Sequence, residues 1–120
     1  MQSPEKSKQS YTYNNGFIKI QYLYQNQRWE FVVQSLKPNW VHHTDFYDLI
    51  QFPQLKGIAK LYGKVSNYNK SSYNWCLAFG GHIVIENGAY TIFMFDQQSV
   101  NVAQLRIKRL YDACRKRLYN

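Results

Sequence analysis

Hydrophobic and polar residues alternate along much of the chain, with the period of two that is typical of β-strands. Over residues 17–24, Ile18 and Ile20 fall on one side and Lys19 on the other. A second alternating run follows after a short polar link. Two such runs predict an antiparallel hairpin over residues 17–34.

Three later runs are separated by two-residue links of turn-forming residues, Gly80-Gly81 and Asn87-Gly88. Such links supply the positive φ that tight hairpin turns need. We therefore predict a three-stranded meander, with strands over residues 74–79, 82–86 and 89–95.

The end of the chain has a helical period instead. Apolar residues recur every three or four positions from Ala103 to Leu118, which places them on one face of a helix. Asp96 or Ser99 is expected to cap this helix. The chain is therefore predicted to be α+β, with an antiparallel sheet (N-terminal hairpin plus meander) packed against a C-terminal amphipathic helix.

The remaining segments are less regular. Residues 1–15 are polar and without period, so we predict a flexible arm followed by a single α+β domain over residues 16–120. A short helix is expected over residues 46–51, ending before Pro53. The segment that follows it, up to residue 65, fits either a short helix or an irregular strand.

Composition excludes several classes of protein. Of the 120 residues, 45% are hydrophobic, which is enough apolar surface for a folded core. No apolar run reaches the roughly 18 to 20 residues of a membrane span, and no signal-peptide pattern is present. The two isolated cysteines are expected to be buried free thiols. We predict a cytoplasmic protein without a membrane partner.

No group of residues matches a catalytic or metal-binding motif. His42, His43 and Asp45 are close in sequence, but adjacent residues of a strand point to opposite faces and no HxH or HExxH spacing occurs. Cys76 and His82 fall on opposite faces of the predicted meander, which separates a thiol from its base. We therefore predict no metal, no cofactor, no catalytic residue and no enzyme activity.

Charge gives the first candidate site. The net charge is +8, and residues 106–120 hold six basic residues and one acid. Basic side chains along a helix can contact successive phosphates. The helix dipole is the alternative explanation for cations near a helix C-terminus. The candidate nucleic-acid-binding residues are Arg106, Arg109, Arg115, Lys116 and Arg117.

Aromatic residues give the second candidate site. Trp75, Phe79 and Phe93 would share one face of the predicted meander and could stack on nucleic-acid bases. Alternatively, the N-terminal hairpin covers this face and makes it core. Three strands followed by a helix resemble small DNA-binding modules such as the AP2-type domain, whose sheet reads DNA with arginines. Residues 74–95 contain no Lys or Arg, so no family is assigned.

These features predict a small nucleic-acid-binding accessory or regulatory protein whose basic C-terminal helix contacts phosphates. The alternative is a protein interaction module, a subunit, adaptor or inhibitor of a larger complex that docks on an acidic protein surface. Enrichment in Tyr, Trp and Arg fits such an interface equally well.

Overall fold

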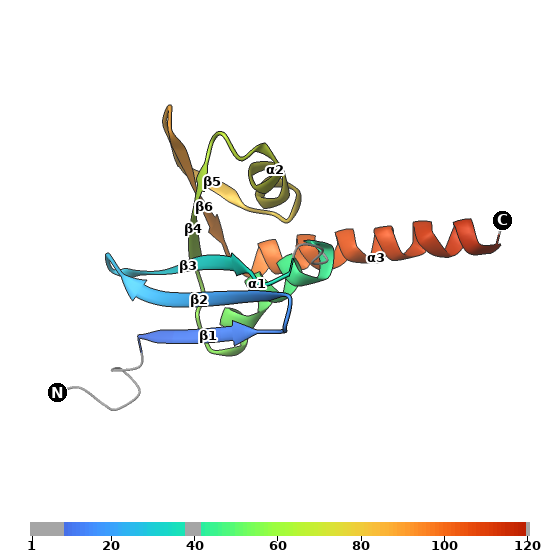
Figure 1. Ribbon diagram of the computed structural model, residues 1–120, viewed down its shortest axis with the longest axis horizontal. Helices are drawn as coiled ribbons and strands as arrows, with labels where there is room; N and C mark the ends of the chain where they lie inside the picture. The colour runs from blue at the N-terminus through green and yellow to red at the C-terminus, as the bar shows by residue number, and fades with distance from the viewer. Residues whose placement is uncertain (1–8, 38–41, 120) are drawn as a thin grey trace.

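The computed structural model describes residues 9–37 and 42–119, with their side chains except those of 42–44 and 115–119. It has the predicted α+β fold (Figure 1). In chain order, the elements are β1 (Ser10–Asn14), β2 (Ile18–Gln25), β3 (Arg28–Ser35), α1 (His42–Leu55), β4 (Leu61–Ser66), α2 (Lys70–Ala78), β5 (His82–Glu86), β6 (Tyr90–Phe95) and α3 (Gln97–Tyr119).

The six strands form one sheet in the order β1-β2-β3-β4-β6-β5. Neighbouring strands are antiparallel except β3 and β4, which are parallel. The sheet is therefore mixed, where antiparallel pairs were expected throughout. A parallel pair needs a crossover connection, and α1 supplies it.

The predicted N-terminal hairpin is confirmed as β2 and β3. Asn26 and Gln27 join the two strands, with positive φ angles of 55° and 61°. β1 pairs with the outer edge of β2, so residues 10–14 of the predicted arm belong to the sheet. Tyr11 and Tyr13 of β1 pack against the core, which explains why this polar segment is ordered. Residues 1–8 lie outside the described residues.

The predicted strand over residues 74–79 is wrong, because most of this segment belongs to helix α2. The Asn69 side chain accepts a hydrogen bond of 3.1 Å from the Ser72 backbone N–H and so caps the first turn. Gly80, with φ of 83°, follows the end of the helix. Cys76 and Phe79, three residues apart, are both buried on its inner side.

The other two strands of the predicted meander are confirmed as the hairpin of β5 and β6. Its register differs from the prediction, because Glu86 pairs with Thr91 and not with Ala89. The pairing also shifts between Ile83 and Ile85, which marks a β-bulge. The Asn87 backbone N–H donates to the Tyr90 carbonyl at 3.1 Å, so the turn is centred one residue later than predicted.

Helices α1 and α2 pack on the same face of the sheet. Tyr22 of β2 stacks on Phe52 of α1 with ring centroids 5.5 Å apart, and Phe93 of β6 meets Tyr73 of α2 at 5.3 Å. The opposite face, here named the open face, is not covered by any described helix. The buried strand residues all belong to the helix-covered face apart from Ile92, and they include Ile18, Ile20, Tyr22, Leu61, Thr91, Phe93 and Phe95.

Two helices differ from the prediction in their extent. α1 is longer than the predicted residues 46–51 and includes Pro53 near its end. α3 is capped as predicted, because Asp96 Oδ1 accepts a hydrogen bond of 3.1 Å from the Ser99 backbone N–H. Ala103 of α3 is buried but Cys114 is exposed, so only the first half of the predicted apolar stripe docks. Figure 1 shows the second half projecting beyond the sheet.

None of the helices in the described part of the chain is both long enough and apolar enough to span a bilayer.

Candidate functional site

The parallel strands β3 and β4 diverge soon after they meet. They pair only at Trp29 with Leu61 and at Glu30 with Tyr62. Beyond these positions, no described strand pairs with the facing edges of residues 31–35 and 63–66. We name the gap between these two segments the strand wedge. Its edges carry backbone N–H and C=O groups that a bound ligand can satisfy.

Phe31 closes the narrow end of the strand wedge. Its ring lies over Gly63. A Cβ added to Gly63 would lie closer to this ring than 3.0 Å, a separation below which real Cβ contacts essentially never occur. On the helix-covered side, the Phe31 ring is 6.1 Å from that of Phe95. Glycine at position 63 therefore allows an aromatic side chain to fill the point where the strands separate.

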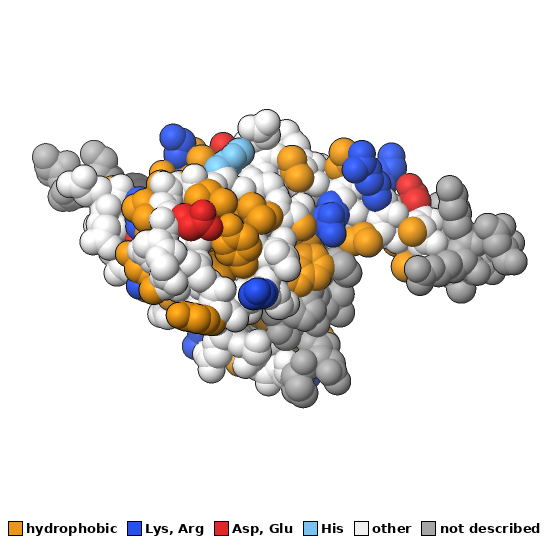
Figure 2. All heavy atoms as spheres, turned by 90° about the horizontal axis from the view of Figure 1, so that it is seen from above, with side chains coloured by type: hydrophobic (Ala, Val, Ile, Leu, Met, Phe, Trp, Pro, Cys, Tyr) orange, Lys and Arg blue, Asp and Glu red, His pale blue; other side chains and the backbone are white. Residues whose placement is uncertain are grey.

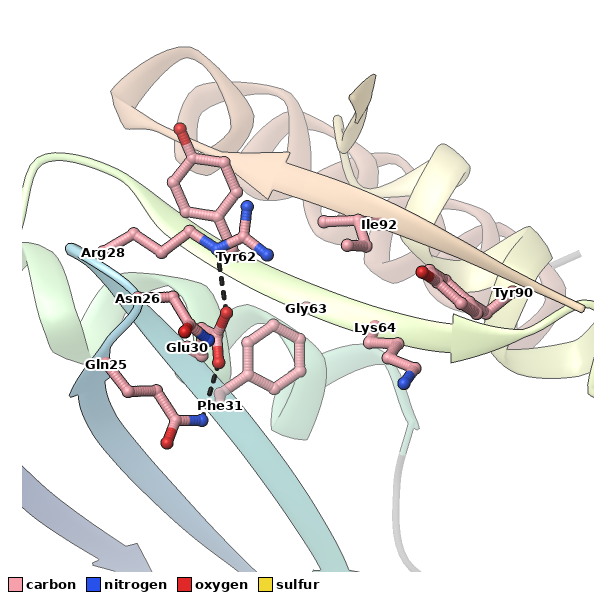
Figure 3. Close-up of a pocket in the computed structure, with 10 residues that line it drawn as sticks. All are labelled: Gln25, Asn26, Arg28, Glu30, Phe31, Tyr62, Gly63, Lys64, Tyr90 and Ile92. Atoms are coloured by element: carbon pink, nitrogen blue, oxygen red, sulfur yellow. Dashed lines mark hydrogen bonds and ion pairs between the residues drawn. The ribbon is translucent and has the colours of Figure 1, made fainter. Parts of the chain in front are cut away.

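A hollow lies on each side of Phe31. The open-face hollow has a volume of about 340 Å³ and opens between β3, β4 and β6 (Figure 3). The helix-side hollow has a volume of about 390 Å³ and lies between β3, β4, α1 and the start of α2. Phe31 and Lys64 line both hollows, so these two residues stand between them.

Charged groups are organised around the open-face hollow. Arg28 Nε donates to Glu30 Oε2 at 2.8 Å, and Gln25 Nε2 donates to Glu30 Oε1 at 2.7 Å. Burial acts to raise the pKa of Glu30, but the bonds and charge of Arg28 and the bond from Gln25 outweigh it, so the pKa is lowered. Glu30 is therefore ionised at neutral pH.

Two cations of this hollow rest on aromatic rings. The Arg28 guanidinium lies 4.8 Å from the centre of the Tyr62 ring, and the Lys64 ammonium lies 4.5 Å from that of Tyr90. Figure 3 shows Arg28 and Glu30 on one side of the hollow and Lys64 and Tyr90 on the other.

The helix-side hollow combines apolar walls with the N-terminus of α2. Phe46 and Leu49 of α1 and Val65 of β4 supply apolar surface. Asn69 and Ser72, at the start of α2, also line it. Helix N-termini carry a partial positive charge and attract anions such as phosphates.

The predicted phosphate-binding residues lie elsewhere. Arg106 and Arg109 are exposed on α3 and line a shallow hollow with the apolar residues Ala78, Val102 and Leu105. Figure 2 shows the Lys and Arg side chains along this projecting helix. The side chains of Arg115, Lys116 and Arg117 lie outside the described residues.

The predicted stacking face is core. Phe79 and Phe93 have no exposed surface, so the prediction that they stack on bases is wrong. The reason is that residues 70–78 form a helix, which covers the sheet face instead of extending it. Trp75 is half-buried and packs on Phe79 with ring centroids 5.2 Å apart.

Other chemistry considered from the sequence is not assembled either. Cys76 is buried, and burial raises the pKa of its thiol to about 12. Among the described side chains, no group of three or more His, Cys, Asp or Glu residues is placed to hold a metal ion. His42 and His43 have side chains outside the described residues.

Sequence reasoning missed Arg28, Glu30, Tyr62 and Lys64. One available signal was Gly63 within an otherwise strand-like run, because a glycine inside a strand marks the close approach of another group. The pairing of β3 with β4 had no local signal.

No protein-family model matches the chain, and no curated protein matches it. Its fold is nevertheless similar to solved structures. The N-acetyltransferase PseH from Campylobacter jejuni is 13% identical, with a TM-score of 0.58 over 68% of this chain and 60% of that one. The same enzyme in complex with acetyl coenzyme A is 15% identical, with a TM-score of 0.58 and the same coverage.

Two further solved structures have a similar fold. YncA from Salmonella typhimurium, a candidate acetyltransferase solved with its cofactor acetyl-CoA, is 10% identical, with a TM-score of 0.56 over 67% of this chain and 57% of that one. FdhC, described as a nucleotide-linked sugar GNAT, is 10% identical, with a TM-score of 0.57 over 76% of this chain and 55% of that one.

The chain therefore has a GNAT-like fold, a six-stranded mixed sheet with three helices. Its structural neighbours are acetyltransferases, which overturns the predictions of a nucleic-acid-binding or interaction protein and of a protein that is not an enzyme. The chain spans 55–60% of the length of these neighbours. At identities of 10–15%, the likeness establishes the fold alone.

Proposed function

We propose that this chain binds acetyl-CoA in the strand wedge and contributes to acetyl transfer. The observation that carries the proposal is the divergence of β3 and β4 after two paired positions, with a hollow on each side of Phe31. Two of the structures with this fold, PseH and YncA, were solved with acetyl-CoA. The neighbours are longer chains, so the activity of a complete transferase does not follow from the shared fold. We include that activity in the proposal.

The residues present fit the chemistry of acetyl-CoA. Its pantetheine arm is an extended chain with two amide groups, which can bond to the unpaired edges of residues 31–35 and 63–66 as an added strand would. Phe46, Leu49 and Val65 would contact the apolar parts of the arm. The N-terminus of α2, where Asn69 and Ser72 line this hollow, would attract the phosphates.

The open-face hollow would take the acceptor. When bound, acetyl-CoA supplies an activated acetyl thioester. Glu30, ionised because its pKa is lowered, would attract an ammonium group and hold it near Phe31. A carboxylate with a lowered pKa is a weak base, so the ammonium would release its proton to water before the neutral amine reacts.

The cytoplasmic location predicted from the cysteines remains part of this proposal. Cys76 and Cys114 are both free thiols, which suits a reducing compartment.

Calorimetric titration with acetyl-CoA tests the proposed function directly. We expect the wild-type chain to bind it, and Val33→Trp, which fills the helix-side hollow, to lose most of the affinity. Val84→Trp is the matched control, because Val84 is an exposed valine on β5, away from both hollows. Folded wild-type protein that binds no acetyl-CoA at millimolar concentration would overturn the proposal, as would equal losses in both variants.

A further inference from the structure

The open face of the sheet has an excess of positive charge next to the proposed acceptor hollow. Arg28 and Lys64 line this hollow together with one acid, Glu30, which leaves a local charge of +1 (two cations minus one carboxylate). Lys19 adds a third cation on the same face, where it pairs with Gln34 in the β2–β3 ladder. The hollow is therefore electrostatically suited to an anionic group.

Glu30 offsets the charge of Arg28, to which it is bonded, and leaves that of Lys64. Arg28 Nε bonds to one oxygen and Gln25 Nε2 to the other. The Lys64 ammonium has no such carboxylate partner among the described residues, and it rests on the Tyr90 ring instead. The unbalanced positive charge therefore belongs to the Lys64 side of the hollow.

Arg28 is held in one orientation while part of its donor set stays available. Its guanidinium is fixed by the bond to Glu30 at 2.8 Å and by the Tyr62 ring at 4.8 Å. Its two Nη groups make no hydrogen bond to any described residue. A pre-oriented guanidinium can donate two parallel bonds to a carboxylate or phosphate, and little side-chain entropy is lost when it does.

We propose that the acceptor taken by the open-face hollow is a small amine that carries a phosphate or carboxylate group, bound by Arg28 and Lys64. The anionic group would lie between the two cations, which come from the two strands that flank the hollow. The ammonium of the same molecule would face Glu30. Arg28 and Lys64 then determine specificity, and neither takes part in the bond changes. This inference rests on the proposed function.

Calorimetric titration with three related probes tests the inference: phosphoethanolamine, β-alanine and ethanolamine. We expect the two anionic amines to bind and ethanolamine to bind at least about tenfold more weakly, which is the effect of one good charge-assisted contact. The difference between phosphoethanolamine and β-alanine reports whether phosphate or carboxylate is preferred. Ethanolamine binding as tightly as both anionic amines would overturn the inference.

Variants assign the effect to residues. Arg28→Gln is expected to weaken phosphoethanolamine by about tenfold, and Arg28→Lys by less, because it keeps the charge and loses the two-pronged donor geometry. Lys19→Gln is the matched control, since it removes one cation of the open face outside the hollow. An equal loss in Lys19→Gln and Arg28→Gln would show general attraction to a basic surface and would refute the assignment.

Titration of the same samples with acetyl-CoA separates this inference from the proposed function. Binding of acetyl-CoA without any preference for anionic amines would overturn the inference alone. Binding of phosphoethanolamine that depends on Arg28, in protein that binds no acetyl-CoA, would support the anion site and overturn the transferase proposal.

Discussion

Replacing Gly63 with alanine would place a methyl group against the ring of Phe31. The added Cβ would lie far closer to the ring than the 3.4–4 Å of an ordinary van der Waals contact, so the ring must move by about an ångström or more. Packing against Phe95 limits movement toward the helices. Overpacking of this kind costs about 1–3 kcal/mol of folding free energy. We expect Gly63→Ala to fall in that range.

Urea unfolding followed by circular dichroism measures this cost. Gly88→Ala is the matched control, because a Cβ at Gly88 meets no atom within 4 Å and its φ is not positive. We expect Gly88→Ala to unfold at nearly the wild-type urea concentration. A displaced Phe31 ring would also enter one of the two hollows, so Gly63→Ala should bind acetyl-CoA more weakly.

A double variant shows whether the ring itself causes the loss. Phe31→Leu shortens the side chain that the new methyl group meets, so Gly63→Ala should cost less in the Phe31→Leu background than alone. Residues in direct contact show coupling free energies of about 0.5–3 kcal/mol in such cycles. Additive effects, or a Gly63→Ala variant as stable as Gly88→Ala, would refute the packing of Phe31 on Gly63.

Three further predictions concern the rest of the fold. Asn15→Ala should lower the free energy of unfolding by about 1–3 kcal/mol, because Asn15 donates to Asp45 at 2.6 Å and accepts two backbone N–H bonds. Asn14 is exposed and accepts one backbone N–H bond, so Asn14→Ala should lower it by less, and urea unfolding compares the two variants. Asp96→Ala should cost about 1 kcal/mol at neutral pH through loss of the α3 cap. Burial raises the pKa of Asp96, but the bonds from Ser99 and the nearby His82 outweigh it, so this pKa is lowered. The wild-type advantage should therefore be full above the ordinary Asp pKa of about 4 and be lost as the pH falls below it. Unfolding of both proteins at several pH values measures this, and a constant gap would contradict it. In thiol titration at neutral pH, the exposed Cys114 should react at once and the buried Cys76 only after unfolding. Two fast-reacting thiols in the folded protein would contradict the burial of Cys76.

Local patterns predicted the elements whose partners are close in sequence. The hairpin of β2 and β3 and that of β5 and β6 follow from alternating residues on either side of turn signals. The cap of α3 at Asp96 follows from the same kind of local signal. Parallel pairing of β3 with β4 could not be read in this way, because the two strands are joined through α1 and meet at only two positions.

The error over residues 74–79 had a different cause. An apolar run of this length fits a buried strand or a buried helix, and the glycines at 80 and 81 favoured a hairpin turn. Asn69 ahead of the run is the signal for a helix, because its side chain caps α2. Gly80, with positive φ, marks the helix end and not a hairpin.

For the anion site proposed on the open face, net charge indicates the sign of the ligand but not its position. The basic tail holds most of the excess charge, yet Arg106 and Arg109 lie exposed beside apolar residues on a helix that projects from the body. Arg28 and Lys64 are only two cations, but a strand wedge and two aromatic rings hold them around a hollow. A charge contributes to specific binding when its orientation is fixed before the ligand arrives, since the ordering cost is then already met. Fixed orientation depends on tertiary contacts, which a count of residues does not contain. The count of basic residues along the chain therefore pointed to α3, whereas the packing of the side chains points to Arg28 and Lys64 on the sheet.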